Sequence, residues 1–337
     1  MSNESLPQIL SDAGSIGILH HWDADGIASA AQVMAIDRDK EYGNDIPTIG
    51  NFTDLLPAID RLTDGERDLI LGLDLAVTSE RLKEISASLD IPLAWVDHHS
   101  NPPSPVEGVH LFHPQLRPGY PWEANAWFLA SLLRANGILP AVGICGDMGF
   151  ELRSHPVRRV VERMLPGDFD LDQLFAVTDL IDSNYRVDHA GEVRRAPSVL
   201  VEHLEDPVEL LDVGVWRRNK DRVDTELERL AGVEIRHKGD VAIKDIESGM
   251  HITSVVARRF AIDNAGSARV VIVRHYRHDN AIFYVRRTGP EPDLVPVIGL
   301  ARNRGYSAGG KPEVVGMVVP VDEVEPMTEQ ILRYMEA

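Results

Sequence analysis

DLILGLD at residues 68–74 and PLAWVDHH at residues 92–99 are two short apolar runs, and each ends in polar side chains. Apolar runs of this length predict buried strands, here at Asp68–Leu73 and Pro92–Val96. The segment between them, Thr78–Leu89, predicts a helix with Thr78 as its N-cap. A strand, a helix and a second strand in this order predict a mostly parallel sheet covered by helices, which is an α/β fold.

The same alternation continues on both sides of this stretch. Strands are predicted at Ser15–His21 and Pro47–Phe52, and helices at Gly26–Ile36, Leu55–Leu62, Trp122–Ala135 and Pro156–Leu165. We therefore expect residues 1–190 to form one parallel-sheet domain.

The rest of the chain predicts a helical connector and a second, smaller α/β domain. Residues 191–234 are highly charged and compatible with helices, and residues 235–337 contain further strand patterns. The strands are predicted at Val241–Ile246, Ala268–Tyr276, Ala281–Arg286 and Val314–Val321, the helices at His251–Phe260 and Glu323–Tyr334, and a glycine-containing loop at Leu300–Lys311.

The composition excludes several classes of protein. Cys145 is the only cysteine among 337 residues, so an intrachain disulfide and a cysteine-based zinc cluster are both impossible. Its apolar surroundings favour a small core residue over a nucleophile. Because no apolar run approaches the roughly 18 residues that span a bilayer and no secretory signal pattern opens the chain, we expect a cytoplasmic protein without membrane association.

The net charge of −19 is concentrated in the first two thirds of the chain. Residues 236–337 hold 14 Lys and Arg against 13 Asp and Glu, which leaves 20 basic and 40 acidic residues in residues 1–235. Such an acidic domain repels duplex nucleic acid unless a local basic groove overrides the field. Short or single-stranded partners are therefore favoured.

Four polar clusters stand out in the first domain. They are HWDADG at residues 21–26, Asp74 at the end of its strand, DHH at residues 97–99 and GDMG at residues 146–149. Each has a plainer interpretation when taken alone: Asp25 or a neighbour caps a helix, the two histidines lie on a loop, and Asp147 occupies a turn. Together they place carboxylates and imidazoles at what we expect to be the strand ends of one sheet, where such folds bind ligands.

This set of ligands indicates a metal centre. Carboxylates mixed with imidazoles, without a thiolate, favour Mn²⁺, with Mg²⁺ possible and Zn²⁺ less suited. Two ions about 3.5–4 Å apart share a carboxylate and activate a water for attack on a phosphodiester. Phosphoester hydrolysis is therefore the predicted chemistry.

The ordered set HWDADG, LGLDL, VDHHS and GDMG, within residues 15–150, resembles the DHH phosphoesterase superfamily and is most similar to its RecJ-like members. That superfamily includes exonucleases, oligonucleotide and pAp phosphatases, cyclic-dinucleotide phosphodiesterases and inorganic pyrophosphatases. The second domain resembles the smaller DHHA1 domain of the same proteins.

The resemblance implies a role for each matching residue. Asp74 bridges two ions, Asp97 orients its neighbours, and His99 contacts the scissile phosphate or acts as an acid. The implied metal ligands are His21, Asp23, Asp25, Asp74, His98 and Asp147.

In the second domain the resemblance implies a substrate-binding surface. Arg286 matches a substrate-binding arginine on a strand, and Gly309, Gly310 and Lys311 stand in the glycine signature. Lys311 replaces the histidine of the family pattern, and valines at 314 and 315 replace small residues. Arg287, Arg302 and Arg304 lie near in sequence, although ordinary surface arginines explain the same pattern.

Three functions remain open from the sequence. The first is an exonuclease or phosphodiesterase on single-stranded DNA, single-stranded RNA or short oligonucleotides. The second is a phosphatase acting on pAp or a cyclic dinucleotide. The third is a nuclease-like scaffold in a replication or repair complex, which the presence of every implied ligand disfavours.

Overall fold

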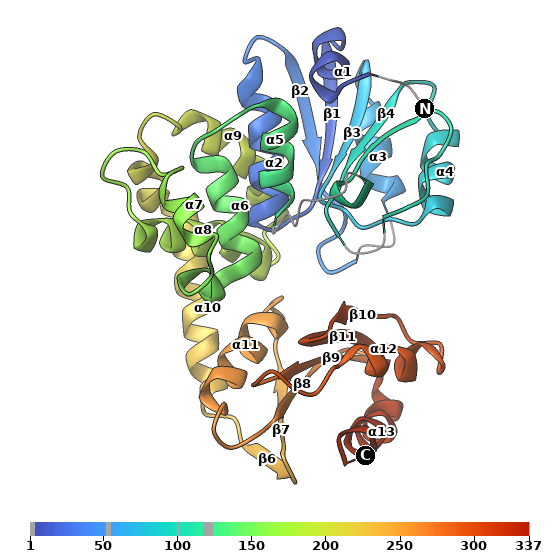
Figure 1. The fold of residues 1–337 in the computed structure, drawn as a ribbon, viewed down its shortest axis with the longest axis vertical. Coiled ribbons are helices and arrows are strands. Elements are labelled where there is room, and N and C mark those ends of the chain that lie inside the picture. The colour runs from blue at the N-terminus through green and yellow to red at the C-terminus, as the bar shows by residue number, and fades with distance from the viewer. Residues whose placement is uncertain (1–3, 52–54, 100–101, 117–123, 337) are drawn as a thin grey trace. The chain divides into compact units, whose positions relative to one another are not determined.

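The computed structural model describes residues 4–51, 55–99, 102–116 and 124–336, and the chain divides into two units, Met1–Lys220 and Asp221–Ala337. The first unit is built on a sheet of five parallel strands in the order β2-β1-β3-β4-β5 (Figure 1). Its elements are α1 (Leu6–Asp12), β1 (Ser15–His20), α2 (Ala24–Ile36), β2 (Glu41–Asp45), α3 (Leu56–Thr63), β3 (Leu69–Leu73), α4 (Ser79–Ala87), β4 (Leu93–Val96), β5 (Val109–Phe112), η1 (Pro114–Leu116), α5 (Asn125–Leu133), α6 (Ile138–Met148), η2 (Gly149–Arg153), α7 (Arg158–Glu162), α8 (Leu171–Arg186), α9 (Ala190–Glu202) and η3 (Pro207–Asp212).

Both faces of the parallel sheet are covered, which explains why its central strands are apolar throughout. On one face Ile70 and Trp95 pack against α3 and α4, and on the other Ile18 and Leu71 pack against α1, α2 and α5. Gly72 makes room for the buried Trp95 ring, since a Cβ at this position would lie 2.2 Å from it. A separate helical core joins α2 to α6, α8 and α9. The predicted α/β fold class is therefore confirmed for this unit.

The second unit holds a mixed six-stranded sheet in the order β10-β11-β9-β8-β7-β6. Helix α10 (Gly214–Ala231) contains the division between the units, and residues 191–234, predicted as a connector, include most of α9 and all of η3 and α10. The remaining elements are β6 (Ile235–Lys238), β7 (Val241–Glu247), α11 (Thr253–Asp263), β8 (Val270–Arg277), β9 (Asn280–Arg287), α12 (Val295–Arg302), β10 (Ala308–Lys311), β11 (Val314–Pro320), η4 (Val321–Glu323) and α13 (Val324–Glu336).

Two sequence predictions about the elements are wrong. The strand expected at 47–52 is absent from its described residues, and the edge strand is β2, whose sequence EYGND is largely polar because only β1 pairs with it. The stretch expected as a loop at 300–311 contains the end of α12 and the exposed strand β10. In both cases an edge strand lacks the apolar run that identifies a buried strand. Phe52 and Trp122, the ends of two predicted elements, lie outside the described residues.

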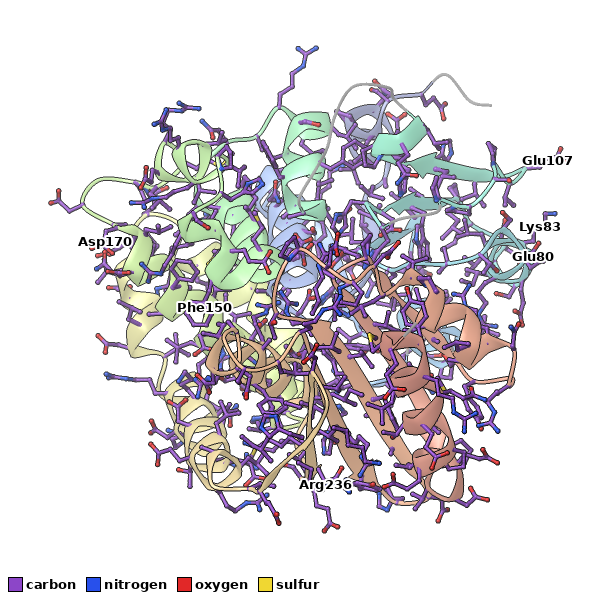
Figure 2. The ribbon with its side chains drawn as sticks, turned by 60° about the horizontal axis from the view of Figure 1, so that its bottom comes forward. Glu80, Lys83, Glu107, Phe150, Asp170 and Arg236 are labelled. Carbon is purple, nitrogen blue, oxygen red and sulfur yellow. The ribbon has the colours of Figure 1, made fainter. Side chains whose placement is uncertain are left out.

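Many acidic side chains of the first unit point away from the fold. Glu80 on α4 and Asp170, the N-cap of α8, both extend outward (Figure 2). Asp170 also forms a capping box with Gln173, so part of this charge stabilises helix ends. In the described residues, no helix is long and apolar enough to cross a membrane.

Candidate metal centre

The carboxyl ends of three neighbouring strands carry the polar clusters. His21 follows β1, Asp74 follows β3 and Asp97 follows β4. The sheet ladder continues through these residues, because the N–H groups of His21, Asp74 and Asp97 donate to the carbonyls of Leu73, Val96 and Phe112 at 3.2, 3.0 and 3.2 Å. The backbone of the candidate site is therefore fixed by the sheet itself.

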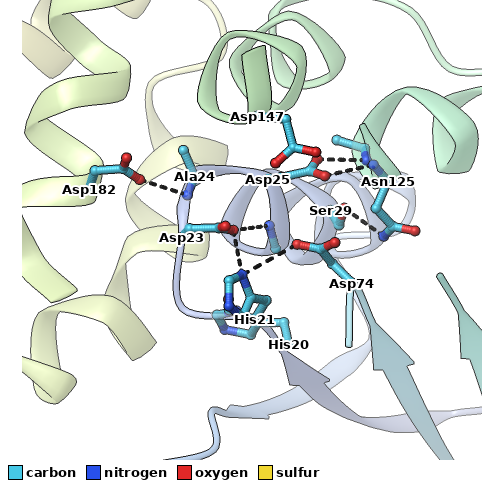
Figure 3. A network of polar contacts seen from close by, with 12 residues as sticks. His20, His21, Asp23, Ala24, Asp25, Ser29, Asp74, Asn125, Asp147 and Asp182 are labelled. Carbon is cyan, nitrogen blue, oxygen red and sulfur yellow. Dashed lines mark hydrogen bonds and ion pairs between the residues drawn. The ribbon is translucent and has the colours of Figure 1, made fainter. Parts of the chain in front are cut away.

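The first candidate ligand group joins the turn after β1 to the end of β3. His21 Nδ1 lies 2.8 Å from Asp23 Oδ1 and 3.6 Å from Asp74 Oδ2 (Figure 3). Asp23 is also the N-cap of α2, where its side chain accepts a hydrogen bond from Gly26 N–H at 3.1 Å. His21, Asp23 and Asp74 offer ligand atoms that lie within 4.8 Å of one another.

The second group joins the first turn of α2 and the last turn of α6 to the segment that follows β4. His98 Nε2 is 3.3 Å from Asp147 Oδ2 and 3.8 Å from Asp25 Oδ2. The buried Asp25 carboxylate accepts the backbone N–H groups of Asn125 and Ala126 at 2.6 and 2.8 Å, at the start of α5. Asp25, His98 and Asp147 again offer ligand atoms within 4.8 Å of one another.

Asp74 lies between the two groups. Its Oδ2 faces His21, whereas its Oδ1 faces His98 Nε2 at 3.5 Å and His99 Nδ1 at 3.9 Å. Asp74 Oδ1 is buried without a hydrogen-bond partner, which is costly for a carboxylate unless a cation neutralises it. Asp74 also has a left-handed backbone, with φ of 60°, a conformation that residues other than glycine adopt at some cost. This geometry suits a carboxylate that bridges two divalent ions.

The charges in the centre also call for a cation. Burial together with Asp74 and Asp147 raises the pKa of Asp25 well above its ordinary value. Burial likewise raises the pKa of Asp147 to about 6. For His98, burial lowers the pKa, but Asp74 and Asp147 outweigh it and raise the pKa well above 6.5. Bound protons thus stabilise this cluster of carboxylates when no divalent ion is bound, and divalent ions would replace them. The residues present fit Mn²⁺ or Mg²⁺.

His99 differs from His98 in both exposure and partner. Its side chain is 43% exposed, and its Nδ1 lies 2.7 Å from Asp97 Oδ1. Burial lowers the pKa of His99, but the buried Asp97 carboxylate outweighs it and raises the pKa. The backbone of His99 is held by His113, whose Nε2 donates to the His99 carbonyl at 2.8 Å while its Nδ1 accepts from Gln115 N–H. His99 is thus an oriented imidazole, open to solvent, beside the candidate metal ligands.

The structure brings together all the residues of the first domain that the sequence singles out, but it corrects where two of them come from. Asp147 lies in the last turn of α6, not at a strand end, and Asp25 lies in the first turn of α2. The apolar run before Asp147 is helical because a short buried helix and a buried strand have the same apolar pattern. Cys145 is buried in α6, and burial raises the pKa of its thiol to about 12, as expected for a core residue.

Several residues that support the site were missed from the sequence. His113 supports His99, and Asp182 on α8 accepts a hydrogen bond from Ala24 N–H at 2.9 Å. His20 is buried beside His21 with its Nδ1 2.7 Å from the His21 carbonyl, and burial lowers its pKa to about 4. Only Asp182 had a detectable signal, since Asp182 and Arg186 are spaced four residues apart on a helix.

The residues predicted to bind substrate lie in the second unit. Arg286 on β9 pairs with Val314 on β11, and Val314 pairs with Lys311 on β10, so these side chains share one face of the sheet. Gly309 and Gly310 lie on β10, and a Cβ on Gly310 would be 2.1 Å from the Val314 carbonyl.

Two further arginines near this surface already have partners. Arg302 donates to the Ala308 carbonyl from two of its nitrogens, and Arg304 pairs with Glu323 at 3.1 Å. Part of their hydrogen-bonding capacity is therefore already used within the second unit.

Comparisons with known proteins agree with this fold. No protein-family model matches the sequence, and no curated protein matches it significantly. A solved RecJ exonuclease bound to manganese is 19% identical with a TM-score of 0.66, over 99% of this chain and 95% of that one. The DHH domain of a member of the s1p family of ribosomal proteins is 14% identical with a TM-score of 0.66, over 97% and 87%. A pGpG-specific phosphodiesterase from Vibrio cholerae is 11% identical with a TM-score of 0.50, over 95% and 99%.

The chain therefore has the fold of these RecJ-like and DHH-domain structures, as its motifs led us to expect. The likeness extends over both units. At these identities it establishes the fold, so activity and substrate have to be argued from the site.

Proposed function

We propose that the chain is a metal-dependent phosphodiesterase that acts as an exonuclease on single-stranded DNA or RNA, or on short oligonucleotides. The observation that carries the proposal is the position of Asp74, whose two carboxylate oxygens face different ligand groups. Two ions that share one carboxylate are typical of centres that hydrolyse phosphoesters.

In this proposal each group of residues holds one ion. His21, Asp23 and Asp74 would hold the first, and Asp25, His98 and Asp147 would hold the second, with Asp74 Oδ1 only 3.5 Å from His98 Nε2. When bound, the two ions, with Mn²⁺ favoured and Mg²⁺ possible, would lower the pKa of the attacking water and neutralise charge on the phosphate.

His99 and Asp97 then act on the substrate side of the centre. The exposed His99 imidazole donates a hydrogen bond or a proton to the phosphate or to the leaving oxygen. Asp97 holds Nδ1 of His99 at 2.7 Å, which leaves Nε2 to contact the substrate and raises the pKa of the imidazole. Asp97 is thus a positioning residue for His99.

The proposed substrate-binding surface for the nucleotide chain lies on the second unit. Arg286 and Lys311 lie on one face of its sheet, two strands apart, so a phosphate near both would be held by two cations. Gly309 and Gly310 belong to the edge strand β10, whose outward N–H groups are available for a phosphate oxygen. A replication or repair protein as a further partner remains part of the proposal.

Cleavage assays with end-labelled substrates test the function. We expect the full chain with Mn²⁺ to shorten single-stranded DNA or RNA, and Asp74→Ala to abolish the activity. If neither single strands, dinucleotides nor pAp were cleaved, the proposal would be wrong. Selective cleavage of dinucleotides, cyclic dinucleotides or pAp would favour the small-nucleotide alternative, a class that includes the pGpG phosphodiesterase of similar fold.

The proposed substrate-binding surface can be tested with a matched control variant. Arg287 follows Arg286 on β9, so it carries the same charge on the opposite face of the sheet. Arg286→Ala is expected to raise KM for oligonucleotides at least tenfold, while Arg287→Ala leaves KM nearly unchanged. Equal effects of the two variants would show that the face of the sheet does not matter.

A further inference from the structure

The Ala24 peptide is the covalent link between the two candidate ligand groups. Asp23 on one side belongs to the first group and Asp25 on the other belongs to the second. Ala24 is the first residue of α2, so its N–H has no carbonyl partner within the helix. The orientation of this peptide therefore sets how the two carboxylates stand relative to each other.

A residue far along the chain holds this peptide. Asp182 Oδ1 on α8 accepts the Ala24 N–H at 2.9 Å, across 158 residues (Figure 3). Both groups are buried, and Asp182 is only 7% exposed. A hydrogen bond from a backbone N–H to a charged acceptor in such surroundings is strong and well directed.

Asp182 is itself held in place by an ion-pair network. Its Oδ2 accepts from Arg186 Nη2 at 2.9 Å, one helical turn further along α8. Arg186 Nη1 also pairs with Asp179, which in turn lies 3.3 Å from Lys220 Nζ. Burial raises the pKa of Asp182 to about 7, and the Arg186 guanidinium opposes this by favouring the carboxylate. The network thus keeps one oxygen of Asp182 aimed at Ala24.

We infer that Asp182 is a positioning residue of the metal centre, which anchors the Ala24 peptide and so sets the spacing between Asp23 and Asp25. This rests on the metal-dependent function proposed above. Replacing a residue that orients metal ligands without binding the metal itself typically changes the metal affinity by about 10- to 100-fold. Loss of the anchor should therefore weaken Mn²⁺ binding although no ligand is altered.

The test is a Mn²⁺ titration of the full chain by calorimetry, with thermal unfolding of each variant measured without metal. Asp182→Ala is expected to weaken Mn²⁺ binding at least tenfold. Asp182→Asn keeps an oxygen acceptor for Ala24 N–H and should retain most of the affinity. Asp179→Ala loses the pairing with Arg186 and Lys220 but leaves the anchor, so it should lower the unfolding temperature without weakening Mn²⁺ binding.

Ala24→Pro provides a second route if Asp182→Ala does not fold. Proline is tolerated at the first position of a helix, and it removes the donor, because its Cδ takes the place of the hydrogen that points at Asp182 Oδ1 and so displaces that oxygen from the Ala24 peptide. It should weaken Mn²⁺ binding as Asp182→Ala does.

Wild-type affinity in Asp182→Ala or Ala24→Pro would overturn the inference, as would an equal loss in Asp179→Ala. If the wild-type chain itself bound no Mn²⁺, the proposed function would fail first, and the two failures are thereby distinguished.

Discussion

Asp25 Oδ1 accepts the backbone N–H of Ala126 at 2.8 Å, so a residue at the start of α2 fixes the start of α5, 101 residues further along the chain. Asp25 Oδ2 accepts the N–H of Asn125 in the same way. The carboxylate therefore satisfies two N–H groups that a helix start leaves without partners. One candidate ligand thus has both a structural and a metal-binding role.

The double role of Asp25 predicts the effect of Asp25→Asn. An asparagine offers one oxygen where two backbone N–H groups need acceptors, so one of them loses its hydrogen bond. We expect the free energy of unfolding of the metal-free chain to fall by about 1–3 kcal/mol, together with a loss of Mn²⁺ binding. Denaturant unfolding and a Mn²⁺ titration measure the two effects.

Asp147→Asn is the matched comparison. Asp147 contacts His98 at 3.3 Å, and its pKa is raised by burial and by neighbouring carboxylates. Removing its charge should relieve repulsion, so Mn²⁺ affinity falls while the metal-free chain is as stable as the wild type or slightly more so. If Asp147→Asn destabilised the chain as much as Asp25→Asn, the assignment of the structural role to Asp25 alone would be wrong.

Gly143 on α6 gives a test that changes no ligand. A Cβ at this position would lie 2.4 Å from Asp25 Oδ1 and 2.5 Å from Ala126 Cβ, so Gly143→Ala must displace the carboxylate. We expect weaker Mn²⁺ binding and lower stability. Gly191→Ala, on helix α9 with nothing within 4 Å of the added Cβ, should leave Mn²⁺ binding unchanged. A Gly143→Ala variant with wild-type Mn²⁺ affinity would contradict the observed packing.

His99 is expected to act on the substrate more than on the ions. His99→Gln should therefore retain most of the Mn²⁺ affinity but lower kcat by about 10²–10⁴-fold, the usual contribution of a general acid. Asp97→Asn should give a smaller loss, since the imidazole keeps its neighbour but loses the charge that raises its pKa. Steady-state kinetics with an oligonucleotide, beside a Mn²⁺ titration, separates the effects. Loss of metal binding in His99→Gln would make His99 a ligand instead.

The second unit carries a pH dependence of its own. His275 is buried between Thr253 Oγ1 at 2.7 Å and the Ser248 carbonyl at 2.8 Å, and burial lowers its pKa. Because the folded pKa lies below the unfolded value of 6.5, the unfolded chain binds the extra proton first. Stability is therefore fully present above pH 6.5 and falls as the pH drops below it.

Unfolding of His275→Gln at several pH values checks this prediction. The variant should be less stable than the wild type at pH 8, and the difference should shrink by pH 5. A constant difference between the two proteins over this range would rule out titration of His275.

The buried parts of the first unit could be predicted from the sequence, whereas its edges could not. The strands that contain Leu71 and Trp95 are apolar because helices cover both faces of the sheet, and such runs are easily recognised. The edge strand β2 is polar, and the helix that ends at Asp147 has the same apolar pattern as a strand. Local pattern therefore identified the buried centre of the sheet, and it failed at the polar edge strand β2 and at the buried helix α6.

The same division holds in the metal centre. The candidate ligands were recognisable because carboxylates and histidines follow apolar runs at short spacing, as in Asp97-His98-His99. The supporting residues Asp182 and His113 could not be found in this way, since what matters is the backbone atom they contact. Nothing in the sequence indicates that a distant side chain forms a hydrogen bond with the Ala24 N–H or with the His99 carbonyl.

Two Mn²⁺ ions that share the Asp74 carboxylate would be magnetically coupled, and a Mn²⁺ titration followed by electron paramagnetic resonance detects that coupling. We expect two Mn²⁺ per wild-type chain with a spin-coupled signal, and loss of that coupling in Asp74→Ala. A wild-type chain that binds no Mn²⁺ or a single ion, or an Asp74→Ala variant that keeps the coupled pair, would contradict this expectation.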